Sequence, residues 1–259
     1  MIRYIATDLD GTLIPDNSKL MDPEVFDLIP RLKERGIYFI PASGRQYQSM
    51  RRLFEPVKDD ISYICENGSL CIHEGNVISR GHIDRELGHR IIDAGRKYGK
   101  CSVLVSCESR HYTDSKDPDF IYRMKHIIRN DIEVVDDLYE VDEPYLKLAI
   151  ADMNGTEKLA PYLQEQFSSE IRTVTAGKIW VDFIAPDADK GTALSGLLRH
   201  LGISPCDGIA FGDQHNDREM LKLAGTSYAM STAAPGVEKY ADKIADSVID
   251  VIKNTPGIL

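Results

Sequence analysis

The first apolar run of the chain, within residues 4–13 (YIATDLDGTL), ends on two carboxylates one residue apart, Asp8 and Asp10. Side chains at positions i and i+2 of an extended segment point the same way, Gly11 permits a tight bend, and Thr12 can hydrogen-bond back across it. Two carboxylates this close repel each other and need a cation or a shared proton. Mg²⁺ is the natural candidate because it prefers carboxylate and phosphate oxygens.

An isolated Asp-x-Asp also occurs in structural turns, but three other segments supply groups that such a pair requires. Ser43 and Gly44 follow an apolar segment and offer a hydroxyl and backbone N–H groups suited to an anion. Lys190 stands at the start of an amphipathic helical pattern, where the helix dipole disfavours a cation unless an anion is bound nearby. Asp213 and Asp217 follow another apolar run and add oxygen ligands. Together these residues predict a nucleophile, a second acid, a hydroxyl donor, a fixed cation and a metal cradle.

Three further polar residues are candidates for substrate binding. Arg45 directly follows the Ser43–Gly44 pair and either pairs with a substrate oxygen or forms a salt bridge inside the core. Asn67 and Asn216 either orient a ligand or cap a turn. His215 lies beside Asn216, but a Mg²⁺ site prefers oxygen ligands, so we do not expect it to bind the metal.

The elements that must position these residues alternate between strands and helices. Apolar strands are predicted at residues 3–7, 37–43, 61–67 and 207–213, and each ends at or next to one of the polar positions above. A helix is predicted from Asp22 as N-cap, with Pro23 at its first position, to Gly36. This alternation predicts a doubly wound α/β fold with a parallel sheet, in which ligands bind outside the carboxyl ends of the strands.

The middle of the chain has a different pattern, with clustered strands between helices. We therefore expect an α+β module with a partly antiparallel sheet at residues 82–186, inserted between two halves of the core at 1–81 and 187–259. Its helices are predicted at 83–99, 120–128 and 156–167, and its strands at 101–107, 110–114, 145–152, 171–177 and 180–186.

Composition narrows the class of protein further. The chain has 259 residues, and its 31 basic against 41 acidic residues give a net charge of −10, which argues against nucleic acid or an anionic membrane as a partner. Five cysteines without a C-x-x-C pair predict buried thiols rather than disulfides or a zinc site. No apolar stretch approaches the roughly 18 residues of a membrane helix, so we expect a cytoplasmic protein.

In four segments the chain resembles the haloacid dehalogenase (HAD) superfamily of aspartyl phosphatases: DLDGT at 8–12, ASGR at 42–45, Lys190 in DKGTAL, and GDQHND at 212–217. ENG at 66–68, the long insertion, and the tail YAMSTAAPGVEKYAD are similar to the Cof-type branch. The resemblance implies a Rossmann-like core, an inserted αβ cap that sets specificity, Mg²⁺, and hydrolysis of small phosphorylated metabolites such as sugar phosphates.

The resemblance also implies a role for each catalytic residue. Asp8 would attack the phosphoryl group in line and form a phosphoaspartate. Asp10 would protonate the leaving group and then activate water, while Ser43, Gly44 and Lys190 hold the phosphoryl group. General acid–base help accounts for only about 10²–10⁴-fold of such a reaction, so charge compensation and positioning must supply the rest.

The implied metal ligands are Asp8, Asp10, Asp213 and Asp217, with Asp217 in a supporting position. One departure from the Cof-type pattern is residues 231–233 (Ser-Thr-Ala), where the branch usually carries Asn-Ala. This departure lies outside the four catalytic motifs. It bears only on the contact with substrate or a loop that the Asn would make in the branch.

Two alternatives to a phosphatase stay open at this point. A phosphomutase would use the same aspartyl chemistry with a sugar hydroxyl in place of water. A regulatory protein would accept phosphate on an aspartate or sense a phosphorylated metabolite. Signalling receiver domains are about half this length and need a lasting phosphoaspartate, whereas Asp10 is placed to hydrolyse it.

Overall fold

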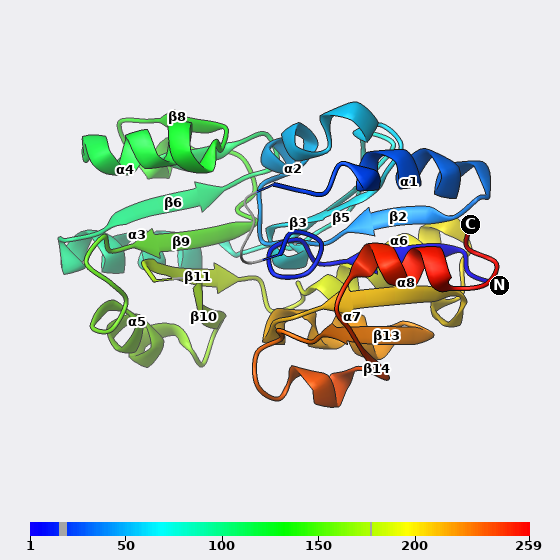
Figure 1. Ribbon diagram of the computed structural model, residues 1–259. Helices are drawn as coiled ribbons and strands as arrows, with labels where there is room; N and C mark the ends of the chain where they lie inside the picture. Colours follow the sequence, from blue (N-terminus) through cyan, green and yellow to red (C-terminus); the bar gives the residue numbers. More distant parts are fainter. Residues whose placement is uncertain (16–19, 177) are drawn as a thin grey trace. The chain divides into compact units, whose positions relative to one another are not determined.

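The computed structural model describes residues 1–15, 20–176 and 178–259. The chain divides into two compact units, Met1–Arg80 with Asp189–Leu259, here called the core unit, and Gly81–Ala188, the inserted unit (Figure 1). The two boundaries between these units lie one and two residues from the positions expected from the sequence.

The core unit is built on a five-stranded sheet in the order β14–β13–β12–β1–β2, and all its pairs are parallel. The strands are β1 (Tyr4–Thr7), β2 (Tyr38–Pro41), β12 (Gly208–Gly212), β13 (Thr226–Met230) and β14 (Lys243–Ala245). The doubly wound α/β prediction is confirmed by this parallel order, with β1 in the interior of the sheet between β12 and β2.

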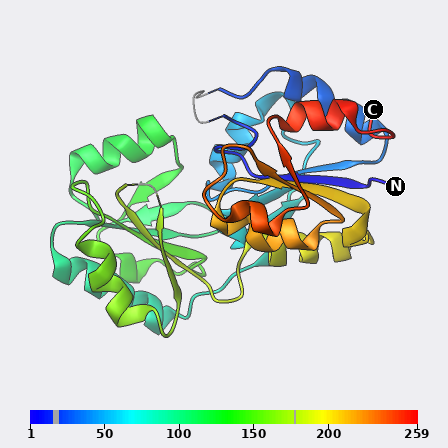
Figure 2. The same ribbon diagram turned by 60° about the horizontal axis from the view of Figure 1, so that its bottom comes forward.

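Helices cover both faces of this sheet. Figure 2 shows α1 and α8 on one face and α6 and α7 on the other. On the second face, Tyr4 and Ala6 of β1 pack in one apolar cluster with Leu194 and Leu197 of α6. The helices are α1 (Glu24–Glu34), α2 (Tyr47–Leu53), α6 (Lys190–Leu201), α7 (Arg218–Leu223) and α8 (Val248–Asn254).

Helix α1 begins slightly later than the sequence predicts. The Asp22 carboxylate accepts from the backbone N–H of Glu24, but Pro23 is the N-cap residue and Glu24 the first helical one. Apolar residues at helical spacing, Val25 and Leu28 among them, are buried on one face as expected.

The third predicted parallel strand is shorter than expected, and its longer pairing is antiparallel. Only Tyr63–Cys65 (β3) is extended, and it pairs antiparallel with β4 (Leu70–His73), which pairs with β5 (Asn76–Arg80). A single parallel bridge between Ala42 and Ile64 joins β3 to the core sheet. The chain cannot continue straight after Cys65 because the next three residues have positive φ and reverse its direction.

The inserted unit contains a six-stranded sheet in the order β10–β11–β9–β6–β7–β8, antiparallel except for the β7–β8 pair. The strands are β6 (Ser102–Ser106), β7 (His111–Thr113), β8 (Ile132–Val134), β9 (Lys147–Ala151), β10 (Arg172–Ala176) and β11 (Trp180–Ile184). The partly antiparallel α+β module is confirmed. Strand β8 was not predicted, and Gly177 of the predicted strand 171–177 lies outside the described residues.

Helices also cover both faces of this second sheet. α3 (Arg85–Tyr98) and α5 (Leu159–Phe167) lie on one face, and α4 (Pro118–Tyr122) with the π-helix Arg123–Ile128 lies on the other (Figure 1). Short 3₁₀ segments complete the two units: Glu55–Val57, Glu66–Gly68, Leu138–Glu140, Pro205–Asp207, His215–Asp217 and Val237–Tyr240.

The cysteines are all free, as predicted, but they are not all buried. Cys65, Cys71 and Cys107 are buried, Cys101 is half-buried, and Cys206 is exposed in the 3₁₀ segment before β12. Among the described helices, none has the length and apolar character needed to cross a membrane.

Candidate active site

The carboxyl ends of three neighbouring strands bring the candidate residues together. Asp8 follows β1 directly and Asp213 follows β12, while Ser43 comes two residues after β2. The parallel register places these ends level, because the Asp8 N–H donates to the Phe211 carbonyl at 3.0 Å and the Ala42 N–H donates to the Thr7 carbonyl at 2.8 Å. The carboxyl ends of these strands therefore lie side by side along one edge of the sheet, as the sequence predicts.

A buried lysine ties two of the carboxylates together. Lys190 Nζ donates to Asp8 Oδ1 at 2.5 Å and to Asp217 Oδ1 at 2.6 Å. The lysine side chain is 0% exposed, so these carboxylates take the place of water around its charge. Burial alone would lower the pKa of Lys190, but Asp217 and Asp8 raise it above its ordinary value. Lys190 is thus a permanent cation at this edge.

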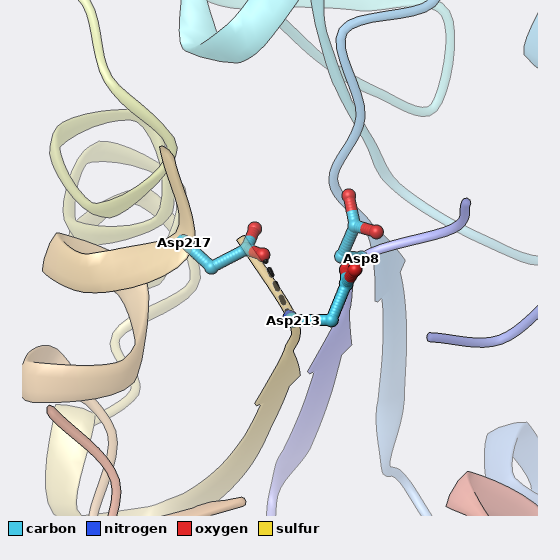
Figure 3. Close-up of side chains that lie close together, drawn as sticks. All are labelled: Asp8, Asp213 and Asp217. Atoms are coloured by element: carbon cyan, nitrogen blue, oxygen red, sulfur yellow. Dashed lines mark hydrogen bonds between the residues drawn. The ribbon is translucent and has the colours of Figure 1, made fainter. Parts of the chain in front are cut away.

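The carboxylates at this edge outnumber the cation. Asp8, Asp213 and Asp217 each place an oxygen within 4.8 Å of the others. Figure 3 shows these three side chains close together. Burial raises the pKa of Asp8 well above its usual value, against the opposing effect of Lys190, and burial also raises the pKa of Asp213. An additional cation bound here would offset both shifts. The donor set consists of oxygens alone, which fits Mg²⁺.

Asp217 differs from the other two carboxylates because one of its oxygens is held by two backbone N–H groups. Oδ1 accepts from Lys190, and Oδ2 accepts from the backbone N–H groups of Asp213 at 3.0 Å and Gln214 at 2.9 Å. Figure 3 shows the bond to the Asp213 backbone as a dashed line. A Cβ at Gly212 would lie 2.5 Å from the Asp217 Cβ, so the loop closes over a glycine. Asp217 therefore shapes the loop that carries Asp213.

Asp213 is oriented by two neighbours that the sequence did not reveal. Its Oδ1 accepts from Thr12 Oγ1 and its Oδ2 from Gln214 Nε2, both at 2.9 Å. The Thr12 side chain was expected to bond back across its own bend, and it donates instead to Asp213, the residue after β12. Gly11 has φ +92°, and a Cβ there would lie 2.3 Å from Asp213 Oδ2. This glycine is therefore needed both for its conformation and for the space it leaves to Asp213.

The carboxylate of Asp10 does not join the group of three acids. It is more than half exposed and forms a bidentate ion pair with Arg45. Arg45 donates to it through Nε at 2.9 Å and through Nη2 at 2.5 Å. The hydrogen bond to Asp10 is the main cause that raises the pKa of Arg45. Of the two interpretations of Arg45, the structure shows the salt bridge, but at the site's edge rather than inside the core.

Ser43 and the two asparagines occupy adjoining loops. Ser43 is buried, and its Oγ accepts from the Arg45 N–H at 3.2 Å, which leaves the hydroxyl hydrogen available to a ligand. The Asn67 N–H donates to the Ser43 carbonyl at 3.0 Å, and Asn216 Nδ2 donates to Asn67 Oδ1 at 3.0 Å. His215 is exposed and lies outside the group of three acids.

The fold and this edge of buried acids around a lysine define a family. A sequence model of the haloacid dehalogenase-like hydrolases matches residues 5–251, and the chain belongs to that family. It is a hydrolase, and two of its curated relatives are named as phosphatases.

Three relatives illustrate the similarity. The chain is 27% identical to the 5-amino-6-(5-phospho-D-ribitylamino)uracil phosphatase YbjI of Escherichia coli, over 97% of this chain and 95% of that one. It is 28% identical to the HMP-PP phosphatase of Cronobacter sakazakii, over 91% and 86%. A solved structure from Eubacterium rectale is 31% identical, covers 94% of this chain and 93% of its own, and superposes with a TM-score of 0.84.

Proposed function

We propose that this protein is a Mg²⁺-dependent phosphatase that hydrolyses a small phosphorylated metabolite through a phosphoaspartate on Asp8. The observation that carries the proposal is the buried contact between Lys190 and Asp8, at the edge where Asp213 and Asp217 also end. A carboxylate fixed by a permanent cation, beside further acids, suits attack on a phosphoryl group whose charge must be neutralised.

Asp8 and Asp213 are the residues that would hold Mg²⁺. A bound Mg²⁺ supplies positive charge that compensates the phosphoryl oxygens. Asp217 accepts from Lys190 through Oδ1 and from two backbone N–H groups through Oδ2, so its part is to hold Lys190 and the backbone of Asp213 in place. Asp10 is left out of this ligand set because its carboxylate is paired with Arg45.

The chain's own residues account for both halves of the reaction. In the first half, a bond forms between an Asp8 oxygen and phosphorus, the bond to the leaving oxygen breaks, and Asp10 gives that oxygen a proton. In the second half, Asp10 takes a proton from water as the water oxygen bonds to phosphorus, and the acyl-phosphate bond between phosphorus and the Asp8 oxygen breaks. Lys190 and the Ser43 hydroxyl hold phosphoryl oxygens throughout, and the Gly44 N–H is available beside them.

The named relatives favour hydrolysis over the two alternatives, a phosphomutase and a regulatory protein. A phosphomutase would need a sugar hydroxyl to reach the phosphoaspartate before water, and the curated relatives above are named as phosphatases. A phosphate-storing signalling protein would need a stable phosphoaspartate, whereas Asp10 lies two residues from Asp8, where it can activate water. The two named activities differ in their substrates, so the proposal extends to phosphorylated metabolites as a class.

A substrate panel tests this function. The protein is incubated with Mg²⁺ and phosphorylated sugars, nucleotides and cofactors, beside Asp8→Asn and a sample with EDTA. We expect phosphate release from at least one compound, lowered about 10³-fold or more by Asp8→Asn and abolished by EDTA. Release that survives Asp8→Asn would contradict the nucleophile, and a stable acyl phosphate at neutral pH would favour signalling.

A further inference from the structure

The carboxylate of Asp213 is held by a side-chain donor at each of its oxygens. Thr12 Oγ1 donates to Oδ1 and Gln214 Nε2 donates to Oδ2, both at 2.9 Å. Thr12 is buried in the turn after β1, whereas Gln214 is the next residue along the chain and is exposed. Because each oxygen has its own donor, the carboxylate cannot turn about its last bond without breaking a hydrogen bond.

The backbone of Gln214 is in turn fixed by Asp217. The Gln214 N–H donates to Asp217 Oδ2 at 2.9 Å, and the Gln214 carbonyl accepts from the Asp217 N–H at 3.0 Å. The Gln214 side chain therefore extends from a fixed point. An ionised Asp213 also sets the direction of the amide, since a carboxylate can only accept and must face the NH₂ end of Gln214.

A fixed carboxylate matters more to Mg²⁺ than to Ca²⁺. Mg²⁺ demands near-ideal octahedral geometry, with oxygens at about 2.0–2.1 Å. Ca²⁺ binds a larger and variable number of oxygens at about 2.3–2.6 Å, and it accepts both oxygens of one carboxylate. With a donor on each oxygen, Asp213 can offer a metal only the lone pairs that these donors leave. This restriction favours the ion with the stricter geometry.

We propose that Gln214 is a positioning residue of the metal site, and that by holding Asp213 Oδ2 it makes the site select Mg²⁺ over Ca²⁺. Gln214 acts through Asp213 rather than on the ion. Removal of such an orienting partner typically costs about 10–100-fold in metal affinity. This role rests on the proposed function, because that proposal names Asp213 as a ligand of Mg²⁺.

Gln214→Leu removes the donor and keeps a side chain of similar bulk without changing the charge of the site. Because Gln214 is exposed, the variant should fold, and its unfolding temperature in EDTA should match that of wild type. Gln166→Leu is the matched control. Gln166 is also exposed, and its Nε2 donates at 2.8 Å to the Tyr162 carbonyl in α5 of the inserted unit.

Titration calorimetry of the metal-free protein with Mg²⁺ and, separately, with Ca²⁺ measures the selectivity. We expect Q214L to raise the Kd of Mg²⁺ about tenfold or more and the Kd of Ca²⁺ less than about threefold. Q166L should bind both ions as wild type does. In steady-state kinetics, the Mg²⁺ concentration that gives half-maximal phosphate release should rise in Q214L, while kcat at saturating Mg²⁺ changes less.

The outcomes separate this inference from the function beneath it. Equal increases in the two Kd values would show that Gln214 supports the site without selecting an ion, and would overturn the inference. Unchanged Kd values would overturn it as well. The expected change in selectivity, in a protein that releases phosphate from no ester, would support the inference and overturn only the proposed function. A wild type that binds neither ion would overturn both.

Discussion

Each of the two units buries a lysine against a carboxylate, but the surroundings of the two lysines differ. In the inserted unit, Lys147 of β9 and Asp182 of β11 form an ion pair at 3.3 Å, with both side chains less than 10% exposed. In the core unit, Lys190 faces an edge where three acids end. A matched pair needs no further ion to be stable, whereas an excess of buried carboxylates needs one. This imbalance distinguishes a site for chemistry from a structural contact.

Removal of the core lysine should have the largest effect. Lys190→Met leaves Asp8 and Asp217 buried without their cation, which costs about 3–5 kcal/mol of unfolding free energy by comparison with other broken buried pairs. Phosphatase activity should fall at least about 10³-fold. Urea unfolding with and without Mg²⁺ measures the first effect and steady-state kinetics the second. A K190M protein as stable as wild type would show that the acids are not held by this lysine.

The pair in the inserted unit should respond differently to single and double replacement. Lys147→Met leaves Asp182 buried, and we expect a loss of about 3 kcal/mol. The double variant Lys147→Met with Asp182→Leu should recover most of that loss, because an apolar pair can replace a buried ion pair. Chemical denaturation of the three proteins measures this. A double variant no more stable than K147M would mean that apolar side chains cannot replace this ion pair.

Magnesium should stabilise the core unit through its excess acids. Binding to the native state alone adds about 2.7 kcal/mol at a metal concentration of 100 times Kd. We expect Mg²⁺ to raise the unfolding temperature of wild type and of K147M, and to have little effect on Asp213→Asn. Differential scanning fluorimetry over a Mg²⁺ series makes the comparison, and an undiminished shift in D213N would remove Asp213 from the ligand set.

The strand-end residues of the core unit were the most predictable part of the site. Asp8, Ser43 and Asp213 follow apolar runs, and parallel strands bring their carboxyl ends to one edge whatever lies between them. Local signals of periodicity and capping also predicted the fold class, the inserted α+β module and the helix starting at Lys190.

Long-range contacts were not predictable in the same way. Thr12 and Asp213 are 201 residues apart, and no local pattern announces their hydrogen bond. The pairing of Asp10 with Arg45 depends on which side chain each loop presents at the edge, which the spacing of the two motifs does not fix. Strand β8 was missed because it has only three residues and two of them are exposed, so that it shows no periodicity.

Alkylation of the cysteines compares the two units without any mutation, and it is the smallest effect that we predict. Burial raises the pKa of Cys71 in the core unit to about 12 and that of Cys101 in the inserted unit to about 11. A raised pKa keeps each group a thiol at pH 8, and thiols alkylate far more slowly than thiolates. We expect iodoacetamide to label Cys206, which is exposed, before any other cysteine of the native protein. Peptide mass spectrometry reads the order, and early labelling of Cys101 would indicate that the inserted unit opens locally.

The central claim is that Asp8 carries the phosphoryl group, and trapping that intermediate tests it most directly. Asp10→Asn should slow the second half of the reaction more than the first when the substrate is p-nitrophenyl phosphate, whose leaving group needs no proton. Acid quenching of D10N during turnover with Mg²⁺, followed by peptide mass spectrometry, should place a phosphoryl group on Asp8 and none in the D8N/D10N control. Turnover with no phosphoryl group on Asp8, or with one on another residue, would contradict the account.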